Sequence, residues 1–292
     1  MSAPDSTDDF VRHRNLLFTV AYEMLGSAAD AEDVLQETWL RWVEVDRADV
    51  RDERAYLVRI ATRLALNRMR ANSRRRESYV GPWLPEPLLT TPDVAEDVEL
   101  ADSVSLAMLT LLETLGPTER AVFVLREVFD FGYEEIAAAV DKTPAAVRQI
   151  AHRARSHVAE RQPRVAATRS ERERVMQTFL TAAATGDIQS LMDVLAPDVV
   201  LVTDGGGFKK AALRPILGRD KVLRFLAAVS QGVDAVADVV VVNGAPALRL
   251  VVDGELDTVA SMVVEDGLVT GLYLVRNPAK LARLDAVVTL TR

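Results

Sequence analysis

The spacing of apolar residues predicts three helices near the start of the chain. Apolar side chains recur every three or four positions over residues 8–25, and the pattern stops at Gly26, a residue typical of helix ends. A second amphipathic helix is expected over 27–43. A third, over about 53–75, contains no glycine or proline. We therefore expect an all-α domain over residues 1–78.

The helical periodicity stops after this domain and resumes near residue 100. Three prolines fall within residues 82–87, where they break any helix, and the chain stays acidic to about residue 99. We interpret 79–100 as a linker rich in proline and acidic residues. A second all-α domain is expected over 101–162.

The second domain contains the pattern of a helix–turn–helix. A short helix is expected over 133–140, followed by a turn over 141–143. Thr143 and Pro144 then form a strong helix start, because a threonine hydroxyl caps free N–H groups and proline fits the first helical position. The following helix carries small apolar residues on one side, which permits close packing on the first helix.

Beyond residue 170 the pattern changes from helices alone to helices followed by strands. The dipeptides Asn243-Gly, Asp253-Gly and Asp266-Gly separate β-branched runs, and they indicate hairpins because both turn residues must accept positive φ. After a linker over 163–170, we expect an α+β domain over 171–292 with a curved antiparallel sheet. The expected helices are 171–185, 187–195 and 220–229, and the expected strands are 199–203, 239–242, 248–252, 258–264 and 268–275.

Composition narrows the classes of function. The 292 residues are 49% apolar and 27% charged, which suits folded domains. The absence of cysteine excludes disulfides and thiolate chemistry, and three histidines disfavour a histidine-built metal site. We expect no cofactor and no metal. No apolar run reaches the ~18–20 residues of a membrane span, and the polar start lacks an apolar signal segment, so we expect a cytoplasmic protein without membrane contact.

The net charge of −8 is unevenly distributed. Two basic blocks, 41–76 and 142–170, each carry a net +6, and acidic blocks flank the first of them. Local charge decides phosphate contact, because a Debye length of about 8 Å screens distant acidic groups. Either block alone could be a solvated basic face. Two of them in one acidic chain favour contact with nucleic acid.

Each basic block lies on one face of a predicted helix. The helix after Pro144 is apolar on one side and carries basic and polar residues on the other. The basic and polar side suits binding in a DNA major groove. The helix over 53–75 carries a row of arginines opposite its buried stripe, which is typical of phosphate-backbone contact. Ordinary amphipathic helices with solvated basic faces are the alternative. The groove-reading residues would be Arg148, Gln149, His152, Arg153 and Ser156, and the arginine row is Arg59, Arg63, Arg70 and Arg74.

The helix before the arginine row combines acidic residues with Trp39 and Trp42. Acidic groups repel DNA phosphates, whereas acidic and aromatic side chains together suit the docking of a basic protein surface. A solvated acidic face over a tryptophan core is the alternative. The acidic residues are Asp30, Glu32, Asp33 and Glu37.

These motifs resemble those of a known family. Ala31-Glu-Asp-Val-Leu-Gln-Glu-Thr-Trp-Leu-Arg-Trp and the segment 56–70 resemble region 2 of extracytoplasmic-function (ECF) sigma factors. Leu115-Gly-Pro-Thr-Glu-Arg-Ala-Val-Phe and the helix–turn–helix resemble region 4. The remainder is similar to the SigJ-type subgroup, whose C-terminal domain is a SnoaL-like, NTF2-like cone. The subgroup's marks here are Tyr79-Val-Gly-Pro-Trp-Leu-Pro-Glu-Pro, Asp204-Gly-Gly-Gly with Lys209, and Asn277-Pro-Ala-Lys-Leu.

The resemblance implies a sigma factor that directs RNA polymerase core to promoters and initiates transcription. Region 2 would dock on the β′ clamp and open the −10 element, and region 4 would contact the β flap and read the −35 element. Asn67 stands where many members have aspartate, which leaves the −10 preference open. The implied core contacts are Asp30, Asp33, Gln36 and Glu37; the −10 contacts are Arg59, Arg63, Asn67, Arg70 and Arg74; the −35 contacts are Arg148, Gln149, His152, Arg153 and Ser156.

The C-terminal domain would regulate the sigma domains in cis. An extra residue, Phe208, separates the glycines of its first motif from Lys209, so the contact of that loop is open. The domain could also hold an unknown small ligand in its cone. The implied interdomain residues are Trp83, Leu84, Pro85, Glu86, Asp204, Gly205, Gly206, Gly207, Lys209, Asn277, Pro278 and Lys280.

Two other classes of function stay open from the residues alone: a helix–turn–helix regulator that acts without polymerase, and an NTF2-like enzyme tethered to DNA. The residues disfavour the enzyme. No histidine or cysteine follows His157, so a catalytic base would have to be a buried carboxylate. Asp204 is the nearest candidate, but an aspartate followed by three glycines fits a turn better.

Overall fold

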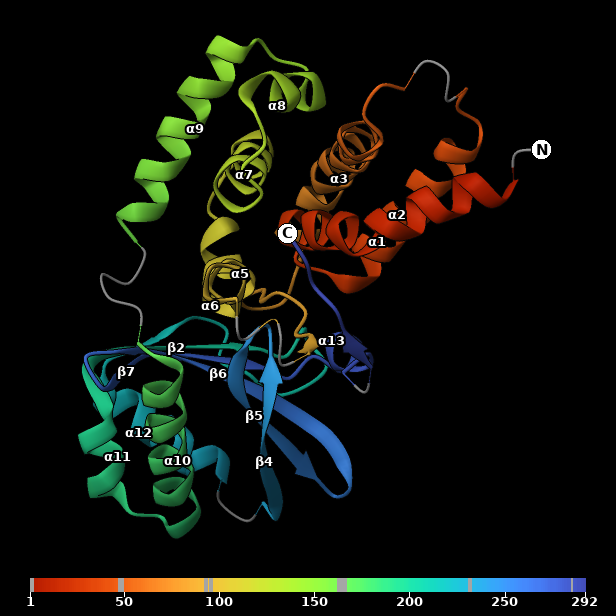
Figure 1. Cartoon of the computed structure of the whole chain (residues 1–292). Coiled ribbons are helices and arrows are strands. Elements are labelled where there is room, and N and C mark those ends of the chain that lie inside the picture. The colour runs from red at the N-terminus through yellow and green to blue at the C-terminus, as the bar shows by residue number, and fades with distance from the viewer. Residues whose placement is uncertain are drawn as a thin grey trace.

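A computed structural model describes residues 3–46, 50–91, 94, 97–161, 167–230, 233–284 and 286–292. Two helical domains sit above a C-terminal domain of strands and helices (Figure 1). Within the described ranges no helix is both long and apolar enough to cross a bilayer.

The first helical domain consists of α1 (Ala3–Leu25), α2 (Ala28–Val43) and α3 (Glu53–Glu77). The three helices confirm the apolar pattern. Side-chain caps start two of them: the Ser27 hydroxyl accepts a hydrogen bond from the Asp30 N–H, and the Asp52 carboxylate accepts one from the Ala55 N–H. Trp42 is fully buried at the centre of the domain.

The second helical domain contains the expected helix–turn–helix. Asp141 adopts the left-handed conformation at φ 56° and ends α8, and the Thr143 hydroxyl caps α9. The elements are α5 (Val98–Val104), α6 (Leu106–Leu112), α7 (Pro117–Phe123), the π-helical continuation η2 (Val124–Val128), α8 (Tyr133–Val140) and α9 (Pro144–Ala159).

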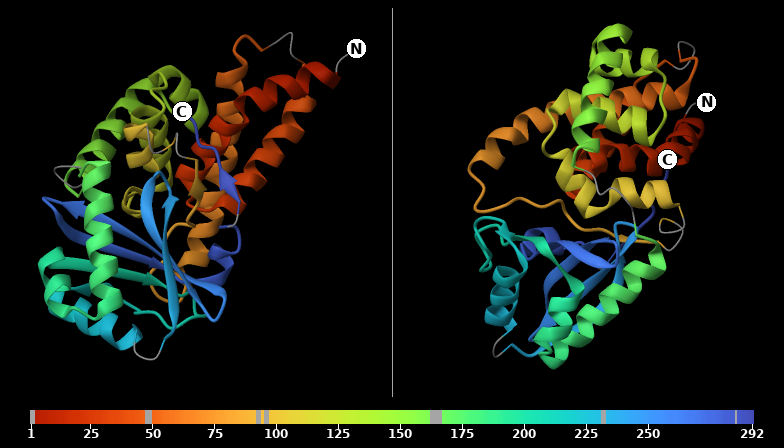
Figure 2. Two further views of the ribbon diagram at one scale, coloured as in Figure 1. Left: turned by 60° about the horizontal axis from the view of Figure 1, so that its bottom comes forward. Right: turned by 90° about the vertical axis from the view of Figure 1, so that its left-hand side faces the viewer.

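In the C-terminal domain, helices cover one face of a curved sheet (Figures 1 and 2). The residues Asn243, Asp253 and Asp266 adopt positive φ, which confirms the predicted hairpin turns. The helices are α10 (Arg169–Thr185), α11 (Ile188–Val194) and α12 (Arg219–Ser230). The strands are β2 (Leu195–Asp204), β3 (Ile216–Leu217), β4 (Ala235–Val242), β5 (Ala245–Val252), β6 (Glu255–Glu265) and β7 (Leu268–Val275).

The sheet differs from the expected antiparallel one at one end, where β2 pairs with β7 in parallel. Hairpins join β4 to β5, β5 to β6 and β6 to β7, and each hairpin makes its two strands antiparallel. No hairpin joins β2 to β7, because α12 and the strands β4–β6 lie between them in the chain. A second parallel pairing joins β1 (Leu89–Thr90) and β8 (Val287–Val288), and the strand order is β3-β2-β7-β6-β5-β4-β1-β8.

Two strands of this sheet come from outside the hairpins. β1 (Leu89–Thr90), in the expected linker, pairs with β4, and β8 (Val287–Val288), in the C-terminal tail, pairs with β1. α13 (Pro278–Leu281) precedes the tail, which runs from the C-terminal domain to α1 (Figure 1). The linker is therefore part of the sheet edge rather than a free tether.

Apolar cores join the three domains. One cluster of buried side chains runs through both helical domains and includes Leu17, Leu57 and Val122. Another contains Leu84 of the linker, Leu106 of α6 and strand residues on the sheet face opposite α10–α12. Because apolar burial stabilises each junction, the chain forms one packed unit in this arrangement.

Candidate nucleic-acid interface and interdomain contacts

The predicted −35 residues all lie on the outer face of α9 and are exposed. On the opposite side Val147, Ala151 and Ala154 are buried against the rest of the domain. The outer face has few internal bonds: the Arg148 guanidinium lies 5.7 Å from the Tyr133 ring centroid. This face is therefore open to a macromolecule. The residues are Arg148, Gln149, His152, Arg153 and Ser156.

The arginine row on α3 is partly covered by α8. The Arg63 guanidinium donates a hydrogen bond of 2.9 Å to the Ala138 carbonyl of α8. Arg59 stacks over Tyr56 and lines a hollow of about 330 Å³ together with Glu135 and Ala138. Further along the helix Asn67 and Arg70 are exposed, and the Arg74 side chain lies outside the described residues. Half of the row thus faces the first helix of the helix–turn–helix.

The predicted polymerase-docking residues share the outer side of α2. Arg68 of α3 pairs with Asp30 at 3.2 Å and with Asp33 at 2.9 Å. Glu37 pairs with Arg41, and Gln36 is exposed. A hollow beside them, of about 330 Å³, is lined by Phe10, Trp39, Asp33 and Gln36 among others. The face therefore offers acidic groups next to an apolar depression.

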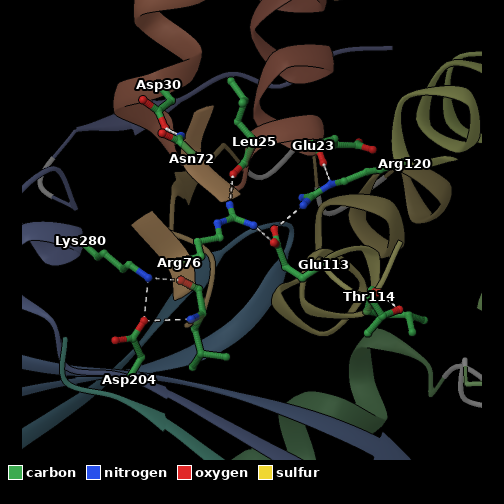
Figure 3. A network of polar contacts seen from close by, with 12 residues as sticks. Glu23, Leu25, Asp30, Asn72, Arg76, Glu113, Thr114, Arg120, Asp204 and Lys280 are labelled. Carbon is green, nitrogen blue, oxygen red and sulfur yellow. Dashed lines mark hydrogen bonds and ion pairs between the residues drawn. The ribbon is translucent and has the colours of Figure 1, made fainter. Parts of the chain in front are cut away.

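Asp204 lies where three distant segments meet (Figure 3). Its fully buried carboxylate accepts hydrogen bonds from the Tyr79 hydroxyl at 2.6 Å and from the Leu84 N–H at 2.9 Å. The Lys280 ammonium forms an ion pair with it at 2.6 Å, and Asn277 donates to the Tyr79 hydroxyl. We call this cluster the clasp: Tyr79, Trp83, Leu84, Asp204, Asn277 and Lys280. Because three donors hold the Asp204 carboxylate, it is not placed to act as a base.

Lys280 connects α13 with the linker. Its ammonium also donates to the Leu84 carbonyl and lies 4.0 Å from the Trp83 ring centroid. The Arg76 guanidinium of α3 lies 3.9 Å from the same ring, so Trp83 contacts two cations. Burial lowers the pKa of Lys280 to about 8, although Asp204 opposes the shift.

The glycine turn after Asp204 allows the Asn277 side chain to lie close to the backbone of the turn. Gly206 has a φ of 58°, and a Cβ there would collide with the Asn277 amide. Lys209 points elsewhere, because its ammonium pairs with Asp257 of the same domain at 3.0 Å. Pro278 is exposed at the start of α13.

A buried ion network joins the two helical domains (Figure 3). Arg120 of α7 is 1% exposed, pairs with Glu113 and donates to the Glu23 carbonyl of α1. Arg76 also pairs with Glu113. Ser103 donates to the buried Glu23 carboxyl, whose pKa burial raises to about 8. Sequence reasoning missed this network; the signal was a lone arginine on the apolar side of α7.

The β4–β5 hairpin forms a second interdomain contact that sequence reasoning missed. Asn243 is 1% exposed and donates to the Tyr22 hydroxyl of α1 at 2.7 Å and to the Val104 carbonyl at 2.8 Å. Its side-chain oxygen accepts from the Leu88 N–H of the linker. Glu86 caps α2 by accepting from the Ala28 N–H. Pro85, beside it, is buried.

The C-terminal tail ends on the helical domains. Leu290 is buried in their common core, and the Thr291 N–H donates to the Thr19 hydroxyl of α1 at 3.1 Å. Arg292 pairs with Asp97 and Glu99. The tail therefore contacts both helical domains.

Comparison with known proteins agrees with this architecture. Residues 10–75 match the family Sigma-70 region 2, and residues 105–158 match Sigma-70, region 4. The chain is 34% identical over 287 residues to the ECF RNA polymerase sigma factor SigJ of Mycobacterium tuberculosis. The aligned region covers 93% of this chain and 92% of that protein. The chain belongs to the ECF sigma factors. It is also 32% identical over 277 residues to the probable ECF sigma factor SigI of the same species, with 94% of each chain covered.

The similarity extends to the whole fold of this sigma factor. The crystal structure of M. tuberculosis SigJ matches with a TM-score of 0.77 at 32% identity, covering 95% of this chain and 99% of that one. As a member of the family, the protein binds RNA polymerase core and promoter DNA to initiate transcription. This is a binding function rather than an enzymatic one.

Proposed function

We propose that this sigma factor works in the cytoplasm through four surfaces and that its C-terminal domain regulates them in cis. The acidic face of α2 docks on the β′ clamp of core polymerase, and the second helical domain contacts the β flap. The arginine row with Asn67 holds the −10 element, and the outer face of α9 reads the −35 element. The clasp keeps these surfaces in a closed, inactive arrangement.

One observation carries the regulatory part: Arg63 donates to Ala138 of α8, so two of the five proposed −10 residues, Arg59 and Arg63, face the −35 domain. Two promoter elements separated along the DNA require these domains to part. The linker must extend between them, yet its Leu84 and Leu88 are buried against the C-terminal domain and the helices. Release of the linker from the clasp therefore precedes promoter binding.

Run-off transcription with purified core enzyme tests this proposal. The template is a promoter selected by the holoenzyme from a library randomised at the −35 and −10 positions. Lys280→Met removes the cation beside buried Asp204, so we expect several-fold more transcript at limiting core concentration. Lys210→Met, an exposed lysine of the same domain, is the matched control and should leave the yield unchanged. Equal or lower yield from the folded Lys280→Met protein would contradict an inhibitory clasp.

The core contact is tested separately. Asp33→Ala combined with Glu37→Ala should weaken core binding while binding to a −35 duplex stays intact, because both residues lie on α2, away from α9. Core affinity is measured by labelled-sigma anisotropy. Unchanged core affinity would show that α2 is not the docking face.

A further inference from the structure

A cavity of about 420 Å³ lies between the second helical domain and the C-terminal sheet. Its roof is α6, through Ala107, Thr110 and Leu111. Its floor belongs to the sheet face opposite α10–α12, the face that packs on Leu84 and Leu106. Interiors rarely hold voids larger than a water molecule, and this volume falls in the range of about 300–1,000 Å³ of small-molecule sites.

The floor is built from two cross-strand pairs of β6 and β7. Ser261 lies opposite Tyr273, and Val263 lies opposite Gly271. A Cβ on Gly271 would stand 3.2 Å from the Tyr273 ring and 3.4 Å from Val263, closer than ordinary contacts. Glycine at this register position therefore keeps the floor open.

Two hydroxyl groups on this floor, those of Tyr273 and Ser261, form no hydrogen bond with the part of the protein that the structure describes. Burial raises the pKa of Tyr273, so its hydroxyl keeps its proton and stays a donor. Other polar side chains of the lining are already paired: Arg172 pairs with Asp102, and Thr270 donates to Glu265. The Tyr273 and Ser261 hydroxyls are therefore the groups through which the floor can bind a polar atom of a ligand.

We propose that this cavity binds a small, largely apolar molecule with one hydrogen-bond acceptor, such as an aryl ketone, and that binding holds the closed arrangement. The acceptor atom of the ligand accepts a hydrogen bond from the Tyr273 hydroxyl, and the apolar part of the ligand packs against α6. Because α6 supplies the roof, the cavity exists only while the two domains are in contact, and a ligand that binds only this state stabilises it. This inference rests on the proposed function, in which the closed state is inactive.

The test uses 6-propionyl-2-dimethylaminonaphthalene, a neutral naphthyl ketone whose emission shifts to the blue in apolar sites. We expect saturable one-to-one binding to the full chain. Tyr273→Phe keeps the ring and removes only the donor, which should weaken binding about 3- to 10-fold. Ala107→Phe fills the space under α6 and should weaken binding about tenfold or more. Ala237→Phe, on the exposed part of β4, is the matched control and should bind as the parent does.

Three results would overturn the inference: no saturable binding, binding unchanged by Ala107→Phe, or a probe that excess core polymerase fails to release. The release of the probe by core polymerase tests whether the site lies between two domains, because separation of the domains removes α6 from the cavity. Thermal melts of each variant verify that it is folded. None of these measurements uses transcription, so the cavity and the clasp can fail independently.

Discussion

The two helices that we propose to bind DNA, α3 and α9, differ in how exposed their basic faces are. The outer face of α9 is exposed over its whole length, whereas the arginine row on α3 faces α8 at Arg59 and Arg63. Both helices are amphipathic and basic, so sequence periodicity describes them in the same way. Their difference comes from what packs on them. Under the proposed function, the closed arrangement would restrict −10 contacts more than −35 contacts.

The largest effect is expected from breaking the buried network that joins the two helical domains. Arg120→Met removes the buried cation that pairs with Glu113 and donates to the Glu23 carbonyl, which should lower the free energy of unfolding by about 3–5 kcal/mol. Urea denaturation measures this loss. Arg169→Met removes an exposed pair with Glu173 and should cost less than about 1 kcal/mol. Similar losses for the two variants would contradict a structural role for the network.

The same network should make the closed arrangement sensitive to pH. Glu23 faces Ser103 of α5 and Arg120 of α7, and burial raises its pKa from 4.5 to about 8. A carboxyl whose pKa is raised on folding stabilises the fold below its unfolded pKa and loses this contribution as pH rises through the folded value. Stability should therefore fall between pH 4.5 and 8, by at most about 1.4 kcal/mol per pH unit.

Urea midpoints across this pH range measure the slope. Glu23→Gln keeps the shape of the side chain without a titrating group, so its slope should be flatter than that of the parent. Parallel profiles for the two proteins would assign the pH dependence to other groups.

DNA binding by the free chain sharpens the comparison of the two helices. Gln149→Ala on the exposed face of α9 should weaken binding to a −35 duplex by about 1–3 kcal/mol, the range for one base contact. Fluorescence anisotropy at fixed salt gives the affinity. Lys142→Ala, an exposed cation in the preceding turn, should affect all duplexes alike. Unchanged affinity of the Gln149→Ala protein for the −35 duplex would contradict the proposal that α9 reads the −35 element.

The smallest effect concerns the covered helix. Arg63→Ala removes one hydrogen bond at the surface, so the free energy of unfolding should change by less than about 1 kcal/mol. The free chain should bind DNA as before, because Arg63 is occupied by Ala138. In the holoenzyme, where α3 is released, the same change should reduce occupancy of the −10 element in footprinting. A loss of DNA binding already in the free chain would mean that α3 is accessible without opening.

Periodicity and turn residues predicted most helices and hairpins because the interactions behind them are local. Thr143 caps α9 through an N–H three residues away, and Asn243-Gly defines a two-residue turn. The parallel pairing of β2 with β7 had no such local signal, nor did the strands β1 and β8. Most clasp residues came from a family resemblance, whereas Glu23 and Tyr273 carried no recognisable pattern, and the signal at Arg120 was only a lone arginine on an apolar helix side.

The sequence by itself determined two basic helical faces, a proline-broken connection and a hairpin-rich α+β domain, because spacing, capping and turn chemistry act over a few residues. Only the tertiary structure decided that the connection is built into the sheet edge, that part of one basic face contacts α8, and that Asp204 receives its donors from Tyr79, Leu84 and Lys280. Among these contacts, the hydrogen bond between Tyr79 and Asp204 joins residues 125 positions apart. Such partners are chosen by burial and shape in the folded state, which no local pattern encodes.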